Sequence, residues 1–117
     1  MRWMLAVLAC VVGAGGCRAA AAEPRRQNPL NEQVRGVLAT GCGRCHDGAA
    51  STAKPAALAV FDLSEPDFAD RLSPARLAKA LRRLEGAVAP DDQPNRVHAA
   101  DVALFAQFVT LELARRR

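Results

Sequence analysis

The residues best able to do chemistry are Cys42, Cys45 and His46, in the run Cys42-Gly43-Arg44-Cys45-His46. This is the C-x-x-C-H spacing used for covalent haem attachment. Two thiols three positions apart on a helix lie about one turn from each other, so both can add to the two vinyl groups on one edge of a porphyrin. His46 follows directly and can bind the iron as its proximal ligand. The motif occurs once and predicts one covalently attached haem c.

Two other chemistries use a pair of cysteines at this spacing. A thioredoxin-like redox site needs a surrounding β-α-β unit, and this sequence does not read as strands alternating with helices. A zinc site could use Cys42, Cys45, His46 and His98. Adjacent Cys45 and His46 cannot easily both reach one tetrahedral ion, however. Both alternatives stay open beside haem, which the spacing favours.

The N-terminus has the layout of a bacterial export signal. Met1 and Arg2 form a short positive start, and residues 3–12 are an apolar run followed by small residues. A bilayer-spanning helix needs about 20 apolar residues, so this run is too short to cross comfortably. The pattern predicts secretion rather than a buried helix.

Two cleavage positions fit this signal. Cleavage before Cys17 would make a lipoprotein, whose acylated cysteine could hold the chain on a membrane, whereas cleavage after Ala22 would release a soluble protein. We therefore expect a signal over residues 1–22 and a domain over residues 23–117, located in the periplasm or anchored to a membrane facing it. With either cut, Cys42 and Cys45 are the only cysteines left to act as thiols in the domain.

With this signal and a single C-x-x-C-H, the sequence resembles the small monohaem cytochromes c of bacteria. The resemblance covers about residues 29–117 and is specific at residues 42–46. It implies an all-α fold of about four helices wrapped around the haem, in which a first helix leads into the motif and the C-terminal helix packs back on it. The family also has a proline shortly after the motif, whose carbonyl accepts the proton of the proximal imidazole; Pro55 is the candidate here.

The motif does not identify the ligand on the distal side of the iron. Many small cytochromes c use methionine, but the two methionines here are Met1 and Met4, both in the predicted signal. The other histidine, His98, lies at helical spacing on an apolar stripe, and the resemblance implies a distal ligand near the C-terminal helix. His98 is therefore the leading candidate, with five-coordinate iron, water or Lys79 as alternatives.

Several segments have the signals of helices. Asn28-Pro29 is a start signal, and the glycines Gly41 and Gly43 are expected to end that first helix near the motif. Residues 56–63 are expected to form a short extended wall. Further helices are predicted to start at residues 64–67 and at Ser73-Pro74, and the last to run from about Val97 to a solvated end at Arg115, Arg116 and Arg117.

Composition limits the classes of function. A chain of 117 residues, 50% hydrophobic and 24% charged, favours one compact domain. A formal net charge of +4 does not by itself argue for nucleic acid, and no phosphate-binding loop or nucleophile triad is visible. We expect a one-electron carrier outside the cytoplasm that exchanges electrons with redox partner proteins, rather than a stand-alone enzyme. The alternatives are a haem protein that binds or senses small ligands such as gases, and a haem subunit of a larger redox complex.

Overall fold

The computed structural model describes residues 27–117, which fold into helices and contain no strand. This confirms the predicted all-α class for that part of the chain. The predicted signal and both of its cleavage positions lie outside the described residues. The elements are α1 (Asn31–His46), α2 (Pro55–Leu58), the 3-10 helix η1 (Phe68–Arg71), α3 (Pro74–Gly86) and α4 (Ala99–Arg115).

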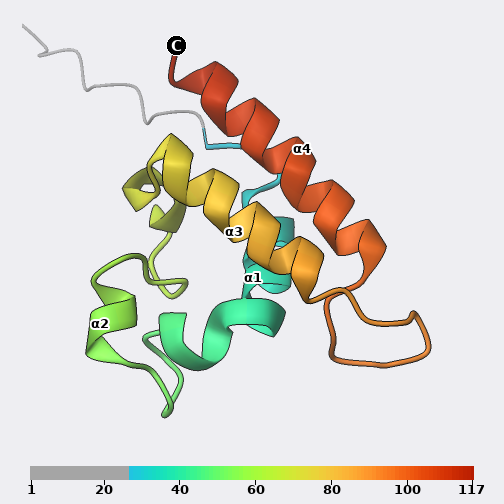
Figure 1. The fold of residues 1–117 in the computed structure, drawn as a ribbon. Helices are drawn as coiled ribbons and strands as arrows, with labels where there is room; N and C mark the ends of the chain where they lie inside the picture. The colour runs from blue at the N-terminus through green and yellow to red at the C-terminus, as the bar shows by residue number, and fades with distance from the viewer. Residues whose placement is uncertain (1–26) are drawn as a thin grey trace, which may run out of the picture.

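The C-terminal helix contacts two of the other helices. α4 packs against both α3 and α1, and Figure 1 shows α3 and α4 running side by side with α1 behind them. The short helix α2 lies at the end of the molecule where α1 finishes, and it contacts α1. The predicted packing of the last helix on the first is therefore present.

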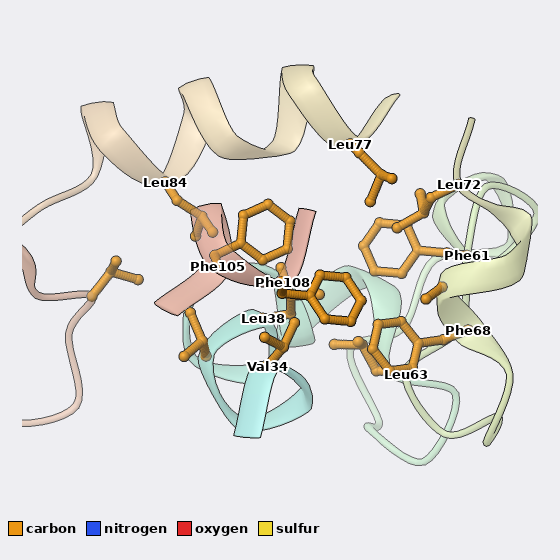
Figure 2. Close-up of a cluster of buried hydrophobic side chains, with 13 residues drawn as sticks. Val34, Leu38, Phe61, Leu63, Phe68, Leu72, Leu77, Leu84, Phe105 and Phe108 are labelled. Atoms are coloured by element: carbon orange, nitrogen blue, oxygen red, sulfur yellow. The ribbon is translucent and has the colours of Figure 1, made fainter. Parts of the chain in front are cut away.

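The core fills the space enclosed by α1, α3, α4 and the chain around η1 (Figure 2). Phe105 and Phe108 of α4 are fully buried and stack with ring centroids 5.8 Å apart. Burying one such side chain contributes roughly 1.5–3 kcal/mol to stability. The other large, fully buried apolar side chains are Val34, Leu38, Phe68, Leu77 and Leu84.

Helix α1 begins later than the sequence signal predicted. The helix starts at Asn31, whereas Asn28 shapes the turn before it: its side-chain oxygen accepts from the Leu30 amide at 3.1 Å, and its carbonyl accepts from the Asn31 amide at 2.9 Å. The Asn28 side chain is buried and donates to the Phe108 carbonyl at 3.1 Å. Asn28 therefore ties the turn to α4 instead of capping a helix at the next residue.

The glycines near the motif do not end α1, contrary to expectation. The helix continues through both of them to His46. A Cβ atom on Gly41 would lie 3.0 Å from Leu84 Cδ2 and 3.2 Å from Val97 Cγ2. The absence of a side chain at Gly41 thus leaves room for the Leu84 and Val97 side chains against α1.

The segment between α1 and α3 also differs from the extended wall that was predicted for residues 56–63. Its first part is helix α2, with Pro55 in the first turn, and the chain is not helical from residues 59 to 67. The predicted helix after residues 64–67 is the single turn η1, which buries Phe68. Helix α3 starts as predicted, with the Ser73 hydroxyl accepting from the Arg76 amide at 3.2 Å.

Two of the C-terminal arginines, which were expected to be solvated, form ion pairs and hydrogen bonds within the fold. Glu112 on α4 is 1% exposed. Arg115 donates to its carboxylate at 2.7 Å and Arg116 at 3.2 Å. Arg116 also donates to the carbonyls of Leu72 and Ala69. The end of α4 is thereby fastened to η1.

Candidate functional site

The C-x-x-C-H motif forms the last turn of α1. Cys42 and Cys45 are free, half-buried thiols on this turn, and His46 is the final residue of the helix. Gly43 is buried, and its carbonyl accepts from the Asp47 amide at 3.2 Å, which closes the helix. The α-helical conformation thus presents both thiols and the imidazole at one end of α1.

All three motif side chains line the same cavity, which has a volume of about 520 Å³. Ligand cavities in proteins usually measure about 300–1,000 Å³. One part of its wall is apolar and combines residues near α2 with one side chain before α3 and one on α3: Ala56, Ala57, Val60, Phe61, Leu72 and Ala80. The other lining residues are four cations, namely Lys54, Arg76, Lys79 and Arg83.

Other hollows lie near α1. One of about 380 Å³ adjoins the first cavity and shares Cys42, Cys45, His46 and Arg83 with it. A larger one of about 640 Å³ is lined by residues that include Glu32 and contains no thiol or imidazole in its wall. We therefore take the cavity that combines both thiols, the imidazole and an apolar wall as the candidate site.

His46 is held by the segment that follows α2. Its Nδ1 lies 3.2 Å from the Phe61 carbonyl, and its own carbonyl accepts from the Leu63 amide at 2.8 Å. The Phe61 ring stacks on the imidazole with centroids 3.9 Å apart. A carbonyl only accepts, so Nδ1 carries the proton in this hydrogen bond, and Nε2 of the neutral ring keeps a lone pair free for a metal.

The carbonyl that orients His46 is therefore not the one predicted. Pro55 was the candidate, but its carbonyl accepts from the Ala59 amide at 3.1 Å within the turn that ends α2. Because Pro55 is the first residue of α2, its carbonyl points along the helix axis and is already bonded within the helix. The position taken by Phe61 could be recognised from the sequence only as an apolar residue after the motif.

The structure also places His98 away from the motif. His98 precedes α4, where its backbone amide donates to the Asp101 carboxylate at 2.8 Å and its Nε2 donates to the Gln93 carbonyl at 2.7 Å. It lines neither of the two hollows that contain Cys42. The role of His98 as the distal ligand stays a prediction, and in this arrangement its Nε2 is bonded to the Gln93 carbonyl outside the cavity.

The same placement removes the four-residue zinc site considered above. Among residues 27–117, no three His, Cys, Asp or Glu side chains are grouped as metal ligands.

Burial raises the pKa of the Cys42 thiol, against a lowering by the charge of Arg83, and the nearby Cys45 raises it further. Catalytic dithiols depend on a lowered thiol pKa, and the described part of the chain has no β-α-β unit. The thioredoxin-like alternative therefore has no support.

Sequence reasoning missed most of the charged wall of the cavity. Arg76, Lys79 and Arg83 are spaced three and four positions apart, which places them on one face of α3. Of these, only Lys79 was considered as an iron ligand. The spacing was visible in the sequence, but nothing in it showed that this face turns toward the motif.

No family model, curated protein or solved structure matches this chain. Within residues 27–117, no helix is both long and apolar enough to cross a membrane.

Proposed function

We propose that this chain is a monohaem c-type cytochrome that carries one electron at a time between redox partner proteins. The observation that carries the proposal is the shared cavity of Cys42, Cys45 and His46, with an apolar wall and with Nδ1 of His46 held by the Phe61 carbonyl. This donor set fits a porphyrin better than it fits a lone metal ion, since it offers two thiols on one helical turn and one imidazole nitrogen.

Each residue of the motif has a separate part in holding the group. Cys42 and Cys45 would hold the haem by adding their S–H bonds across one vinyl double bond each, which would give two thioethers without an oxidant. His46 would hold the iron through Nε2, and the hydrogen bond from Nδ1 to the Phe61 carbonyl orients the ring and would raise its basicity. A bound haem supplies the change of iron oxidation state that moves the electron.

The residues that line the cavity determine the polarity and the charge around the haem site. Val60, Phe61 and Leu72 belong to its apolar part and keep water from that side. Lys54 and Arg76 bring positive charge to the same cavity, where it favours the carboxylates that haem carries. No acid/base pair is required for this function, and we therefore propose an electron-transfer protein and not an enzyme.

The proposal extends to location and partners. The signal predicted over residues 1–22 would place the domain in the periplasm, either soluble or anchored through an acylated Cys17. Its partners would then be donor and acceptor proteins of that compartment.

The test is expression of the full chain with its own leader in a bacterium competent in cytochrome c maturation. The expected product is a red protein whose intact mass includes one haem and whose haem stays attached after denaturation. The double variant Cys42→Ser/Cys45→Ser should lose the covalent haem, whereas Ser51→Ala, an exposed residue of the following loop, should keep it. Colourless wild-type protein of the unmodified mass would refute the proposal.

A further inference from the structure

The wall of the cavity formed by α3 contains one side chain able to bind iron. Arg76, Lys79, Ala80 and Arg83 contribute this wall. Arginine stays protonated in proteins and has no lone pair to give, whereas a lysine amine has one once it loses its proton. Lys79 is thus the potential donor on α3.

Lys79 is an exposed residue that lines the cavity, and its position along α3 is further from the cysteines than that of Arg83. Arg83 lines both hollows that contain Cys42, and its charge acts on the Cys42 thiol. A helix rises about 1.5 Å per residue, so Lys79 lies about 6 Å from Arg83 along the axis and Arg76 about 10 Å. Lys79 therefore lies between the end of α3 near the thiols and the end remote from them.

The remaining donors in the cavity wall are accounted for. Cys42 and Cys45 are the attachment residues, and His46 is the proximal ligand. Lys54 follows His46 in the chain, and its amide donates to the Cys45 carbonyl at 3.1 Å, which ties it to the segment of the proximal ligand. Lys79 comes from a different element, α3, and lines the same cavity.

The other residues considered as distal ligands do not line the cavity among the residues that the structure describes. His98 donates its Nε2 to the Gln93 carbonyl and lies outside the cavity. Both methionines, Met1 and Met4, precede the described residues and belong to the predicted signal. The lining of the cavity contains the Lys79 amine and no methionine.

We propose that the Nζ amine of Lys79 is the second axial ligand of the haem iron, on the side opposite His46. This inference rests on the proposed function, because it needs the covalent haem. It assigns the distal position to α3 and leaves no open iron position for a gas in the resting protein.

The test compares three haem-loaded variants with the wild type by electron paramagnetic resonance and visible spectra of the ferric form. Wild-type iron should be low-spin. Lys79→Ala should lose the low-spin signal and become high-spin, while Arg82→Ala and His98→Ala should keep it. Arg82→Ala is the matched control, since it removes a cation from an exposed position on the same helix that does not line the cavity.

A second variant keeps the assignment testable if Lys79→Ala does not accumulate. Lys79→Met replaces the amine by a thioether, and methionine ligation raises the reduction potential of haem iron. The potential of Lys79→Met should therefore shift upward from that of the wild type, and that of Arg82→Met, which removes a cation from α3 outside the cavity, should not.

The possible failures point to different claims. High-spin ferric iron in the wild type, or a low-spin signal that persists in Lys79→Ala, would overturn the assignment of Lys79 alone. A fall or no change in the potential of Lys79→Met would do the same. Wild-type protein that carries no covalent haem would overturn the proposed function, and the ligand assignment with it.

Discussion

The imidazole of His46 lies flat on the phenyl ring of Phe61, with ring centroids 3.9 Å apart and ring planes inclined by 3°. The same residue orients the imidazole through its backbone carbonyl, 3.2 Å from Nδ1. Phe61 is itself buried in the main core, where Figure 2 shows it beside Leu72. One residue thus connects the candidate site to the core by two separate contacts with the histidine.

Replacing the Phe61 ring separates these two contacts. Phe61→Leu keeps the carbonyl but loses the stacked ring, and we expect the free energy of unfolding in urea to fall by about 1–2 kcal/mol. The NMR shifts of the His46 ring protons should move because the aromatic face above them is gone. Phe105→Leu, which disturbs a stacked pair on α4, should destabilise the protein without moving those shifts. Unchanged His46 shifts in Phe61→Leu would contradict the stacking.

A methyl group at Gly41 should weaken the packing of α1. Gly41→Ala places Cβ 3.0 Å from the buried Leu84 side chain, and overpacking of this kind costs about 1–3 kcal/mol. Gly36 is the matched control, since it lies on the same helix with no atom within 4 Å of an added Cβ. Gly36→Ala should raise the free energy of unfolding by about 0.5–1 kcal/mol through helix propensity. Equal gains from both substitutions would show that α1 does not approach α3 this closely.

The carboxylate of Asp62 makes the loop after the motif sensitive to acid. Hydrogen bonds from the Ser64 hydroxyl, the Gly48 amide and the Ser64 amide hold the pKa of Asp62 below its ordinary value. A carboxyl whose pKa is lower in the folded state stabilises the fold at pH values above its unfolded pKa, about 3.9. That stabilisation is lost as the pH falls through the lower, folded pKa.

The measurement is the difference in free energy of unfolding between the wild type and Asp62→Asn at a series of pH values. The advantage of the wild type should be constant from pH 7 to pH 5 and should shrink below about pH 4. A difference that grows on acidification would have the wrong sign for a lowered pKa. Asp67→Asn, which changes an exposed carboxylate, serves as the reference.

The buried carboxylate of Glu112 should contribute more to the stability of the fold than an exposed carboxylate does. Glu112→Gln removes the negative charge of the carboxylate that accepts hydrogen bonds from Arg115, Arg116 and the Asn28 side-chain amide. Hydrogen bonds to charged groups contribute about 1.5–3 kcal/mol to stability. Thermal or urea unfolding should show a loss in this range. Glu32→Gln breaks a solvent-exposed pair with Arg35 and should cost less than about 0.5 kcal/mol. Similar losses for the two variants would mean that Glu112 is not buried as described.

The sequence by itself was sufficient for the helical class and for the residues of the motif. Spacing along one chain determines both: three positions separate two thiols by one helical turn, and an apolar residue every three or four positions gives a helix one buried face. Helix α3 and its cap at Ser73 follow from such local signals. These features need no knowledge of the rest of the fold.

Only the tertiary structure decided which distant groups meet the motif. It gave His46 the carbonyl of Phe61 and not that of Pro55, it turned His98 to the Gln93 carbonyl, and it placed Lys79 in the cavity wall. Each of these depends on how one element packs against another, through close approaches such as that of Gly41 to Leu84. A periodic pattern defines the buried face of a helix but not its neighbour, because any apolar surface of suitable shape can cover that face.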